Sequence, residues 1–218
     1  TRNPAVSGDS QAEDIVIAKA LSEKISVSGT EILSREELLK ESEDLAIQSQ
    51  IKIIHTPQAR SNNQTESTSG MVIKAAVPVF NNDGKLVGIL YGGKLINRNY
   101  DIVDKTKEVV YKDTKYKGKD IGTATIFQGN MRISTNVLDN KNDRALGTLL
   151  SEKVYKQIFE KDQPWIGSAF VVNNWYISAY EPIWDVQNNI IGVLYVGVLE
   201  EKFIDMRNRT ILLFLSIM

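Results

Sequence analysis

Six polar and aromatic side chains in the second half of the chain have the types and spacing of a small-molecule site. They are Arg132, Ser134, Trp165, Tyr176, Ser178 and Tyr180. Alternation along an extended strand places Arg132, Ser134 and Asn136 on one face, and it groups Tyr176, Ser178 and Tyr180 on a face of another strand. An arginine fork binds a carboxylate bidentately, and aromatic side chains form pocket walls. From spacing alone, the pattern fits a carboxylate pocket and a solvated strand face with ordinary sheet tyrosines equally well. An aromatic box, in which the rings matter most, is a further alternative.

Chemistry that depends on cysteine or on several histidines is disfavoured. The chain has no cysteine and one histidine, His55, so disulfides, thiolate nucleophiles and multi-histidine metal sites are not expected. Gly88 to Lys94 nearly matches a phosphate-binding loop, but Leu95 stands where that motif needs Ser or Thr. No nucleophile and base share a recognisable spacing. We therefore predict a protein that is not an enzyme, with no catalytic residue, no metal and no cofactor.

Length and charge narrow the class of protein further. The 218 residues suffice for one large or two small domains, and 42% hydrophobic with 24% charged residues is a globular composition. Twenty-six basic and twenty-seven acidic side chains leave a net charge of −1. Because no cationic surplus is present to neutralise phosphates, nucleic acid is not an expected partner.

An internal repeat organises the chain. Residues 75–101 align without gaps on residues 179–205, at an offset of 104, and eight of the 27 positions are identical. The identical pairs are Ala75/Ala179, Pro78/Pro182, Gly88/Gly192, Leu90/Leu194, Tyr91/Tyr195, Gly93/Gly197, Leu95/Leu199 and Asp101/Asp205. Each copy reads as two apolar strands around a polar turn, the pattern of a buried antiparallel hairpin. The repeat predicts two sister modules in tandem, with Tyr91 and Tyr195 in structural roles.

A complete module surrounds the second hairpin. Its expected elements are strands at 123–127, 131–137, 165–172 and 175–180, a helix at 151–161 with an apolar face, and the repeated hairpin. Gln128-Gly129-Asn130 is the turn between the first two strands. We therefore expect an α+β fold in which this module is a five-stranded antiparallel sheet with helices on one face.

The first module is expected to be incomplete at its N-terminus. Its helix is predicted at 12–21, capped by Asp9 or Ser10, and only about ten residues precede it, so the opening hairpin is missing and the native chain should extend further. An inserted helix is expected near 34–50, with Ser34 as N-cap and Glu37 at N3, and then a polar loop at 60–70. The expected organisation is a first module at 1–99, a connecting helix and basic turn at 100–120, and a second module at 121–205.

The last residues form an apolar run. Residues 211–218 read ILLFLSIM and are interrupted only by Ser216. Eight residues cannot cross a bilayer, which needs about 20. We expect residues 206–218 to be the start of a transmembrane helix that continues beyond Met218; the alternative is a short C-terminal element packed on the body.

Three segments of this chain resemble a known family. Thr123 to Val137 (TATIFQGNMRISTNV), Ala169 to Ile183 (AFVVNNWYISAYEPI) and Gly192 to Val198 (GVLYVGV) are similar to the Cache, or PAS-like, extracytoplasmic sensor domains of bacterial and archaeal receptors. Residues 70–99 resemble the membrane-distal half of the double Cache arrangement. The missing first helix departs from that pattern, so dimerisation through it finds no support here.

The resemblance implies two stacked PAS-like modules in the extracytoplasmic part of a chemoreceptor or sensor histidine kinase, a homodimer in the full receptor. Such a region binds a small organic molecule, here a carboxylate, in the membrane-proximal module and transmits a conformational signal across the cell membrane. The rival expectation is a solute-binding protein that delivers its ligand to a transporter.

Overall fold

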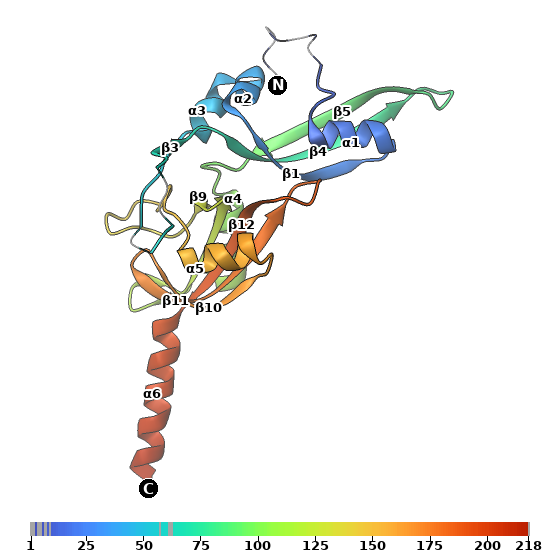
Figure 1. Ribbon diagram of the computed structural model, residues 1–218. Coiled ribbons are helices and arrows are strands. Elements are labelled where there is room, and N and C mark those ends of the chain that lie inside the picture. The colour runs from blue at the N-terminus through green and yellow to red at the C-terminus, as the bar shows by residue number, and fades with distance from the viewer. Residues whose placement is uncertain are drawn as a thin grey trace.

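The computed structural model describes residues 3, 6, 8, 10–56, 58–60 and 63–217. It contains two main antiparallel sheets, two short strand pairs, helices that pack on the sheets and a projecting C-terminal helix. The first sheet lies at the N-terminal end of the molecule, the second lies in the middle, and the long helix α6 leaves the second sheet and points away from both (Figure 1). This is the mixed α and β architecture with antiparallel sheets that the sequence predicts.

The first sheet has three strands in the order β1-β4-β5. Their bounds are Val27–Leu33 for β1, Gly70–Phe80 for β4 and Leu86–Leu95 for β5. Helix α1, Ile15–Glu23, packs on this sheet and buries Val16, Ile17 and Ala20 against Val27 and Ala76.

The predicted bounds of the first helix were wrong. α1 begins three residues later than expected because the Asp14 carboxylate accepts hydrogen bonds from the backbone N–H groups of Val16 and Ile17. Ser10 instead accepts from Ala12 N–H in the loop before the helix. The other expected cap, Asp9, lies outside the described residues.

The inserted segment forms two short helices instead of the one predicted at 34–50. These are α2, Arg35–Glu41, and α3, Glu43–Ser49. The helical conformation is interrupted at Ser42, whose backbone is extended with a φ of −166°. Ser42 caps the start of α3, and this local bond competes with continuation of the helix. The predicted capping box of Ser34 and Glu37 is confirmed. The expected loop at 60–70 contains a strand, β3 (Glu66–Ser67), paired with β2 (Ile51–Lys52).

The second sheet confirms the predicted five antiparallel strands, in the order β10-β11-β12-β8-β9. The bounds are Gly122–Gln128 for β8, Met131–Thr135 for β9, Trp165–Val171 for β10, Asn174–Trp184 for β11 and Ile190–Leu199 for β12. The turn between β8 and β9 contains Gly129 at φ +53°, as its Gln-Gly-Asn sequence suggested. The predicted basic turn at 115–119 is a small hairpin of β6, Lys115–Tyr116, and β7, Lys119–Asp120.

Helices cover both faces of the second sheet, so the expectation of helices on one face was wrong. The predicted helix at 151–161 is α5, Glu152–Tyr155, continued by the π-helical turn η3, Lys156–Glu160; it buries Val154 and Ile158 against Phe127 and Tyr180. On the opposite face, Val103 packs with Ile126 and Ile133. Val103 belongs to the connecting helix α4, Asp101–Thr106, which continues as η2, Lys107–Tyr111. Since the alternating strands are apolar on both faces, each face needs its own cover.

The repeat is visible in the geometry of the two sheets. β11 and β12 have the bounds of β4 and β5 shifted by 104, and the two hairpins carry register shifts at equivalent positions, Val79/Phe80 and Ile183/Trp184. The strand that precedes each hairpin also matches, because β1 pairs Val27 with Ala76 and β10 pairs Trp165 with Tyr180. The sheets differ on one side: β12 pairs with β8, whereas no strand in the described part of the chain pairs with the outer edge of β5.

A buried ionic cluster fixes α1 on the first sheet. The Lys74 ammonium contacts the carboxylates of Asp14 and Glu31, and all three side chains are less than a tenth exposed. Burial raises the pKa of the Glu31 carboxyl. In Lys74 the same desolvation is outweighed by the two carboxylates, so its pKa is raised as well. The cap residue of α1 is thereby tied to the centre of β4.

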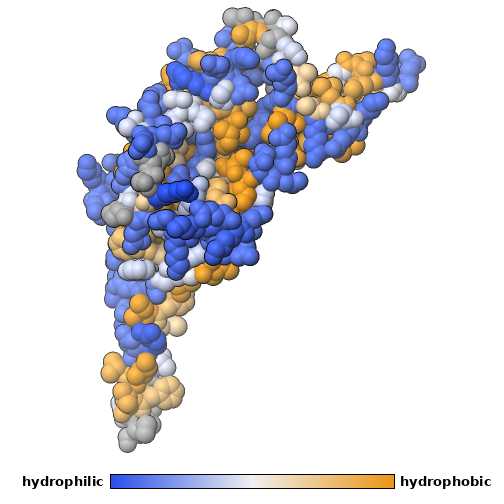
Figure 2. Space-filling view, viewed as in Figure 1, coloured by the Kyte–Doolittle hydropathy of each residue, from blue (hydrophilic) through white to orange (hydrophobic). Residues whose placement is uncertain are grey.

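Helix α6, Glu200–Ile217, begins where β12 ends. Its first two turns are held by the β6–β7 hairpin: Lys117 contacts Glu201 at 3.0 Å and Asp205 at 2.5 Å, and Lys119 contacts Glu201 at 3.1 Å. Apolar side chains gather farther along the helix (Figure 2), where Leu212 and Phe214 are about two-thirds exposed. Within residues 3–217 as described, none of the helices has the length and apolar character to span a bilayer.

Candidate functional site

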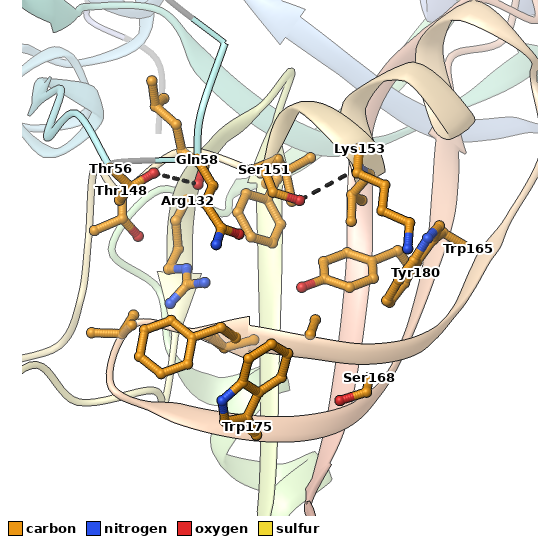
Figure 3. Close-up of a pocket in the computed structure, with 18 residues that line it drawn as sticks. Thr56, Gln58, Arg132, Thr148, Ser151, Lys153, Trp165, Ser168, Trp175 and Tyr180 are labelled. Carbon is orange, nitrogen blue, oxygen red and sulfur yellow. Dashed lines mark hydrogen bonds between the residues drawn. The ribbon is translucent and has the colours of Figure 1, made fainter.

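A cavity of about 370 Å³ lies on the face of the second sheet that α5 covers. Its walls come from β8 and β9, from α5 and the residues before it, from β10 and β11, and from Thr56 and Gln58, which follow β2 far away in the sequence (Figure 3). The segment that carries these two residues is held by hydrogen bonds from Glu152 N–H to Gln58 C=O, 2.8 Å, and from Thr56 Oγ1 to Leu149 C=O, 3.3 Å.

Arg132 projects from β9 into this cavity. Only 4% of the residue is exposed. Its Nε and Nη1 atoms have no hydrogen-bond partner in the described structure, and its guanidinium lies 5.2 Å from the centre of the Phe127 ring. Burial lowers the pKa of the Arg132 guanidinium, yet an arginine stays charged at physiological pH. The site therefore contains a buried cation whose Nε and Nη1 donors are unused.

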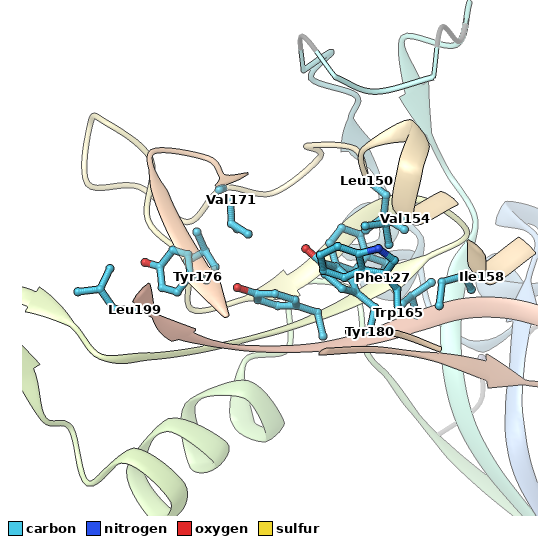
Figure 4. Close-up of a cluster of buried hydrophobic side chains, with 13 residues drawn as sticks. Phe127, Leu150, Val154, Ile158, Trp165, Val171, Tyr176, Tyr180 and Leu199 are labelled. Atoms are coloured by element: carbon cyan, nitrogen blue, oxygen red, sulfur yellow. The ribbon is translucent and has the colours of Figure 1, made fainter. Parts of the chain in front are cut away.

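Aromatic rings form the wall beside Arg132. Tyr180 lies between Phe127 and Trp165, with ring centres 6.4 and 5.6 Å away, and these rings belong to the main core cluster of the second sheet (Figure 4). The Tyr180 hydroxyl points toward the Arg132 side of the cavity (Figure 3). Burial raises the pKa of Tyr180 to about 12, so its hydroxyl is neutral at physiological pH. This wall offers apolar ring surface and one O–H group to a ligand.

Three of the six predicted site residues line the cavity, and three do not. Arg132, Trp165 and Tyr180 are in its wall. Tyr176 and Ser178 are buried on the same face of β11 as Tyr180 but lie outside the cavity wall, and the Ser178 hydroxyl donates to Tyr176 C=O at 3.2 Å. Ligand binding by any of these residues stays a prediction.

Ser134 was expected on the face of Arg132 and lies on the opposite face. The reason is a β-bulge: Phe127 pairs with Arg132 and Ile126 pairs with Ser134, so Ile133 is an extra residue that shifts the alternation. The Ser134 hydroxyl donates instead to Asn99 C=O at 2.5 Å.

The same bulge changes the environments of the neighbouring side chains. Thr135 joins the face of Arg132 and bonds the Thr125 hydroxyl at 2.6 Å. Asn136, expected beside Arg132, is bonded to the backbone of Ala124 and of Val103 in α4.

Sequence reasoning missed several residues of the wall. They are Thr56, Gln58, Thr148, Ser151, Lys153, Ser168, Phe170 and Trp175, among others. Lys153 was detectable in principle, since it precedes Val154 on the predicted apolar helix. Thr56 and Gln58 carried no local signal, because contacts nearly a hundred residues apart in the chain bring them to the site.

An antiparallel sheet with a cavity under its covering helix, a free buried cation and aromatic walls defines a small-molecule binding domain. The family model described as single Cache domain 3 (sCache_3_3) matches residues 94–210, more than half of the chain. The chain belongs to this family of sensor domains, which serve ligand binding in signal transduction. Because such domains bind ligands without catalysis, membership agrees with the expectation of a non-enzyme. The match describes one Cache domain; the double arrangement lies beyond it.

Solved structures similar to this chain include three structures of two chemoreceptor domains. The periplasmic sensory domain of the Campylobacter jejuni chemoreceptor Tlp1 is 13% identical, with a TM-score of 0.37, and the alignment covers 87% of this chain and 56% of that one. The ligand-binding domain of the Pseudomonas aeruginosa PAO1 amino acid chemoreceptor PctB matches in complex with L-Arg (11%, TM-score 0.35, covering 93% and 65%) and with L-Gln (12%, 0.34, covering 93% and 62%). The chain thus spans less than two-thirds of each structure. A comparison with curated proteins gave no match.

Proposed function

We propose that this chain is the extracytoplasmic ligand-sensing region of a transmembrane signalling receptor and that it binds a small carboxylate in the cavity of the second sheet. The observation that carries the proposal is the Arg132 side chain, buried in the cavity wall with Nε and Nη1 unpaired. Isolated buried charges are strongly unfavourable unless a partner compensates them. A ligand carboxylate supplies that partner, because its two oxygens accept two parallel bonds from a guanidinium.

The proposal includes two tandem PAS-like modules, the double Cache arrangement, with boundaries at 1–99 and 121–205. It is supported by the matching strand bounds and the matching bulges of the two sheets. The ligand is assigned to the second, membrane-proximal module because the cavity with the free cation lies there. The buried cation of the first sheet, Lys74, is already paired with Asp14 and Glu31.

Signal transmission is proposed to proceed through α6. The Ser168 hydroxyl is in the cavity wall and donates to the Glu200 carboxylate, at the first residue of α6, at 2.5 Å. A ligand that favours one arrangement of β10 would thereby displace α6. The exposed apolar side chains from Ile211 to Leu215 suit the start of a membrane helix at 206–218. Homodimerisation, an extracytoplasmic location and a kinase or chemoreceptor output are the parts of this proposal that rest on the family resemblance.

The test uses Arg132→Met, which removes the charge and retains an apolar side chain, with the exposed Arg209→Met of α6 as matched control. Carboxylates that stabilise the wild-type protein in a thermal-shift screen are titrated by calorimetry. We expect Arg132→Met to weaken binding roughly 30-fold to several thousand-fold, which corresponds to about 2 to 5 kcal/mol. Arg209→Met should bind like the wild type.

The melting temperature of the ligand-free variants separates binding from folding. Arg132→Met should melt at or above the wild-type temperature, because it removes a buried charge that lacks a partner. Unchanged carboxylate affinity in a folded Arg132→Met protein would contradict the carboxylate proposal.

A further inference from the structure

Lys153 brings a second cation to the cavity. It belongs to α5, and its ammonium lies 5.5 Å from the centre of the Trp165 ring, in the cavity wall. Arg132 and Lys153 lie on opposite sides of the Tyr180 ring (Figure 3). Unlike Lys156, which pairs with Glu152 at 2.9 Å on the same helix, Lys153 has no carboxylate partner in the described part of the chain.

The space between the two cations is aromatic. Phe127 stands beside Arg132, Trp165 stands beside Lys153, and Tyr180 lies between them, with ring-centre distances of 6.4 and 5.6 Å. Both charged side chains in the described cavity wall are thus basic, and they are separated by apolar surface. This arrangement suits a molecule with an anionic group at each end and a hydrocarbon middle.

We infer that the ligand is a linear dicarboxylate, with one carboxylate on Arg132 and the other on Lys153. The inference rests on the carboxylate function proposed above and adds the second charge. An α-amino acid fits less well, because its ammonium group would approach a cation wherever it lies in the cavity. Lys153 is therefore a residue that determines specificity.

The two cations, Arg132 and Lys153, contribute unequally to the affinity for the proposed ligand. Arg132 is buried and unpaired, so loss of its charge removes most of the affinity for any carboxylate. Lys153 is an exposed residue, and an ion pair that retains contact with water is weaker. Lys153 should therefore set the preference for a second carboxylate without being needed for the first.

The experiment compares matched acids on matched variants. Succinate, glutarate and adipate are titrated by calorimetry beside butyrate, pentanoate and hexanoate, at a pH at which all carboxyl groups are ionised. The proteins are wild type, Lys153→Met and the control Lys156→Met. Methionine retains the unbranched stem against Trp165 and removes the charge.

In the wild type, at least one dicarboxylate should bind about tenfold more tightly than the monocarboxylate of equal length. Lys153→Met should abolish that difference, by weakening the dicarboxylate roughly 5- to 10-fold and leaving the monocarboxylate unchanged. Lys156→Met should retain it. Equal affinity for both series in the wild type, or tighter binding of L-glutamine than of any dicarboxylate, would overturn the inference.

The two proposals fail in different ways. If monocarboxylates bind and depend on Arg132 but the second carboxylate adds nothing, the carboxylate function stands and only the dicarboxylate inference is lost. If neither series binds, or if binding ignores Arg132→Met, the proposed function itself is refuted and the dicarboxylate inference falls with it.

Discussion

Tyr180 occupies the position where the aromatic core and the cavity meet. It is 4% exposed, lies 4.8 Å from the Tyr195 ring centre, and has a pKa raised by burial to about 12. Because the unfolded chain ionises its tyrosines near pH 10, the native state retains this proton over a range of pH in which the unfolded state loses it. The folded protein must therefore lose stability as the pH rises through that range.

We predict a loss of unfolding free energy above about pH 10 that is partly due to Tyr180. Between about pH 10 and 12 the raised pKa changes the free energy of unfolding by on the order of 2 kcal/mol. The wild type should therefore lose that much more unfolding free energy than Tyr180→Phe over this range. Urea unfolding from pH 7 to about 12 measures this difference. Parallel pH profiles for the wild type and Tyr180→Phe would show that Tyr180 has the same pKa in the native and the unfolded state, which would contradict the prediction.

How far single residues could be predicted depended on local regularity. Tyr180 followed from strand alternation because β11 is regular there, and Arg132 followed because it precedes the bulge of β9. Ser134 did not, since the bulge at Ile133 reverses the faces, and nothing in the sequence of β9 indicates an extra residue. Thr56 and Gln58 reach the cavity through contacts between distant segments, which no local pattern encodes.

At the scale of elements, the repeated hairpins contain a pair of equivalent glycines in different surroundings. A Cβ atom at Gly192 of β12 would collide with the carbonyl oxygen of Phe127 in β8 and approach the Met71 side chain, whereas one at Gly88 of β5 would meet nothing. The difference arises because β12 has a neighbouring strand on that side and β5 has none in the described residues. The same residue is thus required in one hairpin and replaceable in the other.

We predict that Gly192→Ala destabilises the protein by about 1 to 3 kcal/mol, the usual range for an overpacked core position. Gly88→Ala should be neutral or stabilise by up to about 1 kcal/mol, because alanine restricts the unfolded chain. Urea unfolding of both variants provides the comparison. Equal destabilisation would mean that the edge of β5 is as closely covered as that of β12.

The elements themselves were largely predictable because their signals are local. Two apolar runs around a polar turn gave both hairpins, and Ser34 with Glu37 gave the start of α2. The break at Ser42 was not foreseen, since the residues on either side continue a helical pattern and only the local cap ends it. Coverage of both sheet faces was missed because α4 reaches the second sheet from a segment assigned to a connection.

At the scale of the whole molecule, a small hairpin holds the only long helix in the described structure. Lys117 contacts Glu201 and Asp205, and the Tyr116 hydroxyl donates to Asp205 at 2.7 Å. The carboxylates raise the pKa of Lys117, and the lysine in turn lowers the pKa of both carboxyl groups. Since α6 has few other contacts beyond its first turns, these solvent-exposed pairs set how firmly it is attached.

We predict that Lys117→Met accelerates amide hydrogen exchange in the first two turns of α6 roughly two- to fivefold, with the cavity unaffected. Lys115→Met, on the same hairpin, is the control and should leave exchange unchanged. Hydrogen-exchange mass spectrometry of the wild type and the two variants measures the exchange rates. Identical exchange in all three proteins would show that α6 is held by its apolar contacts alone.

Because Thr56 and Gln58 belong to the cavity wall, the unit that encloses the cavity is larger than the segment 94–210 that the family model matches. The backbone bonds from Ile54 to Gly147, 2.9 Å, and from Glu152 to Gln58 hold this wall in place. Chimeric receptors made by exchanging sensor segments at residue 94 would leave one side of the cavity in the donor. A transplant that retains the whole cavity has to be cut before β2, so the portable unit of this sensor includes part of the first half of the chain.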